Sequence, residues 1–95
     1  MAPICQSRRN WTHGSVMEFE WDPAKSEDNE RRRGLPFALA ILLFDGPILA
    51  VVDDRRDYGE LRIRAIGSVD GKVLHCVYTD RLLPAGKVAR RIISL

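Results

Sequence analysis

Hydrophobic and polar positions alternate where the regular pattern of the chain begins, in residues 17–22 (MEFEWD). Large apolar residues at odd positions and acidic residues at even positions predict a half-buried strand. Residues 22–34 (DPAKSEDNERRRG) predict a helix, with Asp22 as N-cap, Pro23 in the first turn and Gly34 at the exit. Acidic residues crowd its start and arginines its end, as the helix dipole favours. It has few apolar positions, so we expect it on the outside of the domain.

Apolar residues then dominate residues 35–46 (LPFALAILLFDG), where Pro36 marks the start of a second helix and Asp45-Gly46 its end. The segment is apolar nearly all round, which is typical of a buried helix. After it come a predicted strand, PILAVVDD, and a polar turn, RRDYGE.

Residues 61–81 (LRIRAIGSVDGKVLHCVYTDR) predict a β-hairpin with Asp70-Gly71 as a two-residue turn. A loop, LLPAGK, and a last strand, VARRIISL, complete the chain. The resulting order, β-α-α-β-β-β-β, indicates an α+β domain: a small antiparallel sheet with the N-terminal helices packed on one face.

The hairpin turn fixes which residues share a face. It sets Arg64 opposite Val77, Ile66 opposite His75 and Arg62 opposite Thr79. One face then carries a basic set, namely Arg62, Arg64, His75, Thr79 and Arg81, and the other an apolar set, namely Leu61, Ile63, Ala65, Leu74, Cys76 and Tyr78. We expect the apolar face to pack on the second helix and the basic face to be open to water or to a ligand.

The basic face has the side chains that a phosphodiester needs. Arginine binds phosphate through two parallel N–H bonds and stays charged at physiological pH. Histidine titrates near neutrality, so His75 is a candidate for proton transfer. The alternative is a solvated strand face whose charge is balanced by Asp53, Asp54 and Glu60. In this register Tyr78 lies on the apolar face, where its ring belongs to the core.

Charge is distributed unevenly along the chain. Residues 17–60 hold eleven acidic and six basic side chains, a net charge of −5, while residues 61–95 hold two acidic and seven basic ones, +5. Such a split is found where one half binds a polyanion such as nucleic acid. It is found equally where the two halves pair with each other.

The remaining features define a small single domain. Ninety-five residues suit one core, and residues 1–16, which lack any period, predict a flexible N-terminal arm. No apolar run approaches the roughly 20 residues of a membrane span, and no secretory signal follows the first arginines, so we expect a cytoplasmic protein. The two cysteines and two histidines lack ligand spacing, so no metal or other cofactor is expected.

Several segments occur together in a characteristic order, namely FEWDPAKSEDNERRRGLPF, FDGP, DDRRDYGE, AIG, DGKVLHCVYTDR and RRIIS. This ordered set resembles the BrnT-type toxins, over residues 17–94. The resemblance implies a RelE-like fold, a ribonuclease activity that blocks translation, and a cognate antitoxin that is a small DNA-binding protein. It also implies that the chain meets operator DNA only through this antitoxin, in a complex that represses its own operon.

The resemblance assigns site residues position by position. The family's tryptophan-aspartate-x-x-lysine motif and later asparagine fall on Trp21, Asp22, Lys25 and Asn29, and its conserved strand elements on Arg62, Tyr78, Thr79, Arg81 and Arg91–Ser94. Taken with the basic face, this suggests a catalytic set of Arg62, Arg81, Tyr78, Lys25 and Arg91. The expected RNA contacts are Arg64, His75, Thr79, Arg90 and Ser94. The antitoxin is expected to cover the basic face.

Two departures from the family pattern lead to an alternative hypothesis. The family usually has lysine-histidine-glycine at the end of the first helix, where this chain has Arg32-Arg33-Gly34. The family also continues beyond the serine at position 94 with a basic segment and a terminal helix, which this chain lacks. The first hypothesis is a metal-independent endoribonuclease in which the RNA's own 2′-hydroxyl attacks the adjacent phosphate. The second is a non-catalytic homologue that binds its antitoxin and acts in assembly.

Overall fold

The computed structural model describes residues 17–95, so the expected arm over residues 1–16 lies outside the described residues. The elements follow one another as β1 (Met17–Trp21), α1 (Pro23–Arg33), α2 (Leu39–Phe44), β2 (Leu49–Val52), β3 (Ile63–Val69), β4 (Lys72–Leu82), a 3-10 turn (Pro84–Gly86) and β5 (Val88–Ser94). The domain is α+β, as predicted. None of the described helices is long and apolar enough to cross a membrane.

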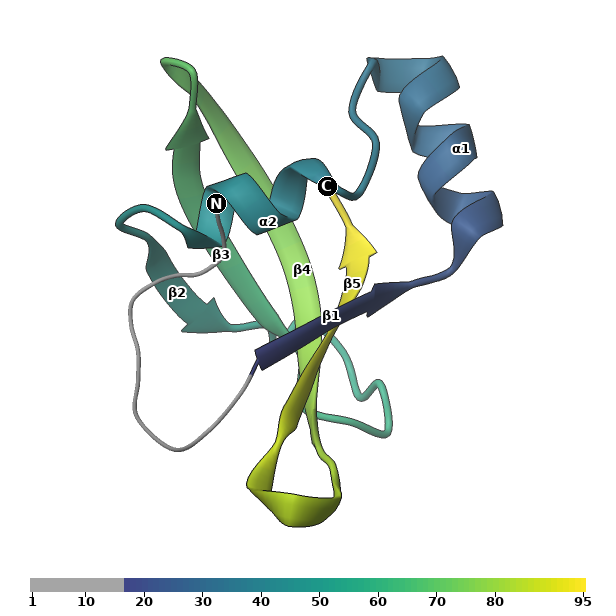
Figure 1. Ribbon diagram of the computed structural model, residues 1–95, viewed down its shortest axis with the longest axis vertical. Coiled ribbons are helices and arrows are strands. Elements are labelled where there is room, and N and C mark those ends of the chain that lie inside the picture. Colours follow the sequence, from purple (N-terminus) through teal and green to yellow (C-terminus); the bar gives the residue numbers. More distant parts are fainter. Residues whose placement is uncertain (1–16) are drawn as a thin grey trace.

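The five strands form one mixed sheet in the order β1-β5-β4-β3-β2 (Figure 1). Neighbouring strands are antiparallel except β1 and β5, which run parallel with Met17 beside Val88 and Trp21 beside Ile92. The prediction of a wholly antiparallel sheet is therefore wrong. A strand's alternation predicts which face is buried, but it contains no information about the direction of a partner far away in the sequence.

The hairpin prediction is confirmed. Asp70 and Gly71 both adopt positive φ, 50° and 79°, as a two-residue turn between strands requires. Val69 pairs with Lys72, and the register continues to Ile63 and Tyr78. The last pair of this hairpin is Ile63 with Tyr78, so Arg62 lies outside the paired strands and not opposite Thr79 as predicted. The backbone there is held instead by the Thr79 hydroxyl, which donates a 2.7 Å hydrogen bond to the carbonyl oxygen of Leu61.

Helix α1 has the predicted ends. The Asp22 carboxylate accepts a bond from the amide of Ala24, Pro23 opens the helix, and Gly34 ends it at φ 72°. Three arginines occupy the last turn, but the first turn contains no acidic residue, so that part of the dipole prediction is wrong. Only Asn29 is buried, which places the helix on the outside as expected.

Helix α2 is shorter and less buried than predicted. It spans Leu39–Phe44 alone, buries Ala40 and Leu43, and leaves Leu42 53% exposed. The residues before it form turns, in which the amides of Leu39, Ala40 and Ile41 donate to carbonyl oxygens three positions back rather than four. Two side chains of α1 hold this segment, because the Phe37 amide donates to the Ser26 hydroxyl and the Asn29 side chain donates to the carbonyl oxygen of Leu35.

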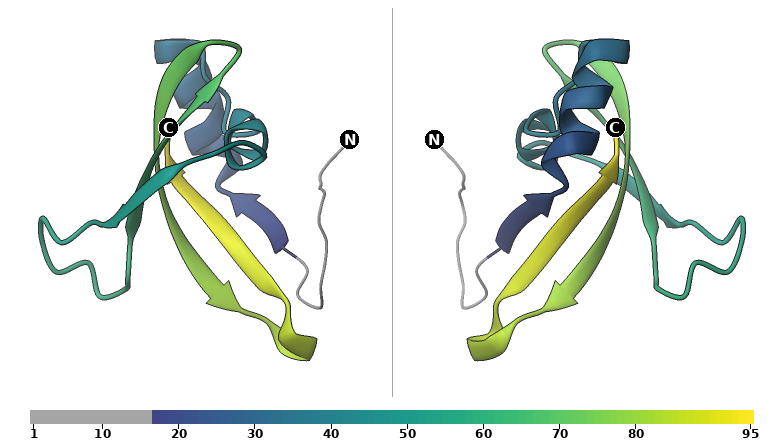
Figure 2. Two further views of the ribbon diagram at one scale, coloured as in Figure 1. Left: turned by 90° about the vertical axis from the view of Figure 1, so that its left-hand side faces the viewer. Right: turned by 90° about the vertical axis from the view of Figure 1, so that its right-hand side faces the viewer.

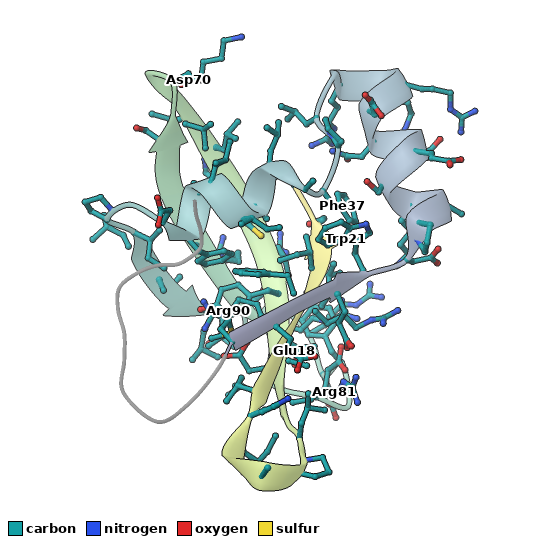
Figure 3. The ribbon with its side chains drawn as sticks, in the orientation of Figure 1. Glu18, Trp21, Phe37, Asp70, Arg81 and Arg90 are labelled. Atoms are coloured by element: carbon teal, nitrogen blue, oxygen red, sulfur yellow. The ribbon has the colours of Figure 1, made fainter. Side chains whose placement is uncertain are left out.

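The core lies between α2 and one face of the sheet. Its buried members are Phe37, Ala40, Leu43, Ala65, Leu74, Cys76, Tyr78, Ile92 and Leu95, with Phe19 and Trp21 packed against them (Figure 3). The apolar face of the hairpin therefore packs under α2, as predicted, except for Leu61, which lies before β3 and is 63% exposed. At Gly67 an added Cβ would lie 2.7 Å from a methyl group of Leu43, so glycine permits this close approach of α2 to β3.

Candidate functional site

The other face of the sheet points away from both helices, and we call it the open face. The strand registers place on it Glu18, Glu20, Leu49, Val51, Arg64, Ile66, Ser68, Val73, His75, Val77, Thr79, Arg81, Ala89, Arg91 and Ser94. The loop between β2 and β3 also lies on this side, as Figure 2 shows. The open face has two parts: a charged half over β1, β5 and the end of β4, and an aliphatic half over β2, β3 and the start of β4.

The charged half centres on one carboxylate between two arginines, which we call the arginine cluster. Arg81 donates from Nε and Nη2 to the two carboxylate oxygens of Glu20 over 2.7 to 3.0 Å, and Nη1 of Arg91 lies 4.0 Å from the same carboxylate. Three strands build this cluster, because β5 pairs with β1 on one side and with β4 on the other. The side chains of Arg81 and Arg91 remain 55% and 47% exposed, so a ligand can reach both.

A second group of arginines lies in the loop of residues 53–62, which we call the arginine loop. Its anchor is Asp53, whose carboxylate is buried and accepts two bonds from the Arg55 guanidinium, at 2.7 and 2.8 Å. The Tyr58 hydroxyl donates to the same carboxylate over 3.3 Å. The bonds from Arg55 hold the pKa of Asp53 down at about 2, and Asp53 in turn raises the pKa of Arg55. This pairing holds the first residues of the loop together directly after β2.

The far end of the arginine loop holds Arg62. Its guanidinium lies 4.3 Å from the centre of the Tyr58 ring and 2.9 Å from Glu60, while that of Arg56 lies 5.5 Å from the same ring. The hydroxyl of Thr79 fixes the adjacent backbone at Leu61. The side chain of Arg62 is therefore held in place, with 27% of its surface exposed.

Arg90 lies on the opposite side of the sheet from the arginine cluster. It makes two bonds to Asp80, at 2.8 and 2.9 Å, and its guanidinium lies within 4.7 Å of the ring centres of Phe44 and Tyr78. Only 16% of its side chain is exposed. Tyr78 is buried beside it, and burial raises the pKa of the Tyr78 hydroxyl. Arg90 and Tyr78 thus belong to the edge of the core.

The other predicted site residues are dispersed. Lys25 is exposed on α1, while Asn29 is buried and donates to main-chain oxygens of Leu35 and Leu95. Arg64 and His75 are exposed on the aliphatic half. Ser94 is exposed at the end of β5, and Thr79 is buried. The structure therefore gathers Arg81 and Arg91 directly and fixes Arg62 through the arginine loop, but it separates them from Tyr78, Arg90 and Lys25.

Sequence reasoning missed Glu20 and the Asp53–Arg55 pair. The alternation in β1 does assign Glu20 to the face opposite Trp21, but only the parallel pairing with β5 brings it to Arg91. For the arginine loop a local signal exists, because Asp53, Arg55 and Tyr58 lie within six residues of one another. Within residues 17–95, no three histidine, cysteine or acidic side chains lie close enough together to hold a metal ion.

Comparison with known proteins adds one finding. Residues 21–95 match a family model described as the ribonuclease toxin, BrnT, of type II toxin–antitoxin systems. No curated protein matches the sequence. The matched segment contains every residue of the arginine cluster and the arginine loop except Glu20, which lies one position before it.

Proposed function

The chain belongs to the BrnT family of ribonuclease toxins of type II toxin–antitoxin systems, and from this premise we propose that it is an endoribonuclease that needs no metal ion and inhibits translation. A toxin of this class has a cognate antitoxin as its partner. The proposal includes a RelE-like arrangement, a cytoplasmic location, and an antitoxin that carries the complex to operator DNA. The arginine cluster is the observation that supports it best.

We assign the scissile phosphate to Arg81 and Arg91. Their guanidiniums approach one carboxylate from two strands, and a phosphate has the same charge sign and a similar spacing of oxygens as that carboxylate. Both are held on strands rather than on a loop, so they are preorganised for the negative charge that develops as the phosphate becomes five-coordinate. To Arg62, whose guanidinium lies against the Tyr58 ring, we assign a neighbouring phosphate of the same RNA strand.

Glu20 is then the group that accepts a proton. The RNA 2′-hydroxyl gives its proton to the Glu20 carboxylate as its oxygen bonds to phosphorus, and the bond from phosphorus to the 5′-oxygen breaks. The leaving 5′-oxygen takes a proton from water, the hydroxide so formed takes back the proton held by Glu20, and a 2′,3′-cyclic phosphate remains on the other product. Glu20 suits this role because the phosphate, on binding Arg81 and Arg91, would displace its carboxylate from them and leave it beside the reacting atoms, ready to accept a proton.

The first test is cleavage of a defined RNA by the purified chain. We expect Arg81→Ala and Arg91→Ala each to lower the cleavage rate about a hundredfold to a thousandfold, the usual cost of losing one preorganised donor. Arg31→Ala is the matched control, because Arg31 is also an exposed, ion-paired arginine, 3.0 Å from Asp28 on α1. It should cleave normally, and all three variants should keep their thermal midpoints within a few degrees.

Two further measurements test the chemistry. Cleavage should continue in a chelator such as EDTA, and Glu20→Gln should remove most of it without unfolding the chain. Cleavage that requires added magnesium, or that persists in both arginine variants, would contradict the mechanism. An unmodified chain that neither cleaves RNA nor arrests growth, yet binds its antitoxin, would favour the non-catalytic alternative.

A further inference from the structure

The aliphatic half of the open face carries an exposed apolar surface that the proposed chemistry does not use. Its members are Leu49, Val51, Ile66 and Val73, with exposed fractions of 74%, 55%, 39% and 67%. We call these four residues the aliphatic patch. Three of them sit on adjoining strands, because Leu49 pairs with Ile66, and Val51 lies two positions along β2 from Leu49. A contiguous apolar surface of this kind marks an interaction site more often than scattered exposed residues do.

A single unpaired guanidinium lies within this apolar surface. Arg64 stands between Val51 on β2 and Val77 on β4, and it forms no ion pair within residues 17–95. The arginine cluster and Arg62, by contrast, already have acidic partners. The other polar residues of the aliphatic half are Ser68 and His75, and none of its members is acidic. A ligand for this surface must therefore offer aliphatic side chains and a carboxylate.

We propose that the cognate antitoxin docks on the aliphatic patch through an amphipathic segment whose apolar side chains cover the patch and whose acidic residue pairs with Arg64. The inference rests on the toxin–antitoxin assignment of the proposed function. It places the anchoring contacts beside the arginine cluster rather than on it. Burying the aliphatic side chains supplies affinity, and the buried carboxylate–guanidinium pair supplies specificity.

The two other kinds of ligand fit this surface less well. In a two-fold dimer across the patch, Arg64 of one copy would lie near Arg64 of the other, and like charges in contact are unfavourable. RNA is bound through cations and stacked aromatic rings. Beside the aliphatic side chains this half offers one imidazole ring, that of His75, and one permanent cation, Arg64, which is little for a surface that has to bind RNA.

The test measures binding of the full chain to its purified cognate antitoxin by titration calorimetry. Val51→Asp and Ile66→Asp should each weaken binding about tenfold to a hundredfold, since each places a charge in the apolar contact. Leu82→Asp is the matched control, because Leu82 is 82% exposed at the far end of β4 and faces the helix side. It should bind as the unmodified chain does. All three positions are exposed, so circular dichroism should show unchanged folding.

A charge test addresses Arg64 separately. Arg64→Glu should weaken the complex about tenfold or more, and the loss should shrink as salt concentration rises. Lys72→Glu changes charge equally at the nearby hairpin turn, on the other face of the sheet, and should have little effect. Equal losses for both variants would show only a general electrostatic attraction and would overturn the proposed contact.

The remaining outcomes separate this inference from the proposed function. Val51→Asp and Ile66→Asp should still cleave RNA and arrest growth but should no longer be neutralised by the antitoxin. If both variants lose RNA cleavage, the patch binds RNA and the inference is overturned. If the chain alone forms a dimer that the Val51→Asp substitution dissociates, the patch binds a second copy, and the inference is likewise overturned. If no variant or parent cleaves RNA while binding still depends on the patch, the ribonuclease proposal fails and the docking proposal stands.

Discussion

At the scale of single residues, two neighbouring residues of the same type have different roles because they lie on opposite faces of the sheet. Arg90 and Arg91 are neighbours in the sequence, yet Arg90 lies against two aromatic rings and Asp80 while Arg91 lies exposed beside Glu20. Alternation along a strand predicts that the two point in opposite directions. It does not predict which of them faces the core, because that depends on the partner strands. The sequence analysis therefore proposed both arginines for the site, Arg91 as a catalytic residue and Arg90 as an RNA contact.

Asp53 should make the stability of the fold depend on pH in the acidic range. Its folded pKa of about 2 lies below the ordinary value of 3.8 because Arg55 binds the carboxylate. The resulting stabilisation is present above the unfolded pKa and is lost as pH falls from about 4 to about 2. We expect Asp53→Asn to remove this part of the pH dependence, measured by urea unfolding at a series of pH values.

The control for this measurement is Asp45→Asn, at an exposed carboxylate after α2. It should keep the acid dependence of the unmodified chain. If Asp53→Asn and Asp45→Asn give the same curve, the Asp53–Arg55 pair does not contribute to acid stability.

At the scale of elements, the sequence predicted structure well where the interacting residues are close together in the chain, and poorly where they are far apart. The hairpin around Asp70 and the caps of α1 involve residues within a few positions of each other, so the sequence contains the whole signal. The parallel pairing of β1 with β5 joins segments about 70 positions apart, and no local pattern specifies it. The start of α2 was misjudged for a related reason, since Ser26 and Asn29 of another helix hold the preceding segment, whose backbone closes turns of three residues.

The contact between α2 and β3 should be sensitive to one added methyl group. In Gly67→Ala the new Cβ would overlap Leu43, which is fully buried, and would also come within 3.2 Å of the carbonyl oxygen of Pro47. We expect a loss of about 1–3 kcal/mol in the free energy of unfolding, typical of an overpacked core. Chemical denaturation with an unchanged slope would measure it.

Gly46→Ala provides the comparison for this element. No atom lies within 4 Å of a Cβ added there, and its φ is not in the left-handed region. Its stability should match that of the unmodified chain within about 0.5 kcal/mol. Equal effects of the two substitutions would mean that the helix moves freely over the sheet at Gly67.

At the scale of the whole molecule, the uneven charge distribution is used largely within the fold. Basic residues of β4, of β5 and of the loop between them pair with acids of β1, as in the contacts of Arg81 and Arg91 with Glu20 and of Lys87 with Glu18. The sequence analysis offered two explanations of the uneven charge, binding of a polyanion and pairing of the two halves. Both explanations involve the same arginines, Arg81 and Arg91. Composition could indicate the basic half, but only the sheet shows that its arginines share a carboxylate.

Cys76 should report on the unfolding of the entire domain. It is fully buried under α2, and burial raises the pKa of its thiol to about 12, so the thiolate that alkylating agents attack is scarce in the folded state. In a Cys5→Ser variant Cys76 is the sole cysteine. We expect iodoacetamide at about pH 8 to modify it only in denaturant, with the same midpoint as the loss of far-ultraviolet circular dichroism. Modification well before that midpoint would indicate that α2 opens independently.

The central position of β5 also determines when the arginine cluster can form. Among the described strands β5 is synthesised last but pairs with both β4 and β1, so during synthesis β1 has no neighbour in this sheet until residues 88–94 have emerged. Until then Glu20 cannot meet Arg81 and Arg91, whatever has already folded. A nascent chain whose residues 88–94 are still inside the ribosome therefore lacks its arginine cluster. If that cluster is the site of RNA cleavage, as proposed, the nascent chain stays inactive until β5 has left the ribosome.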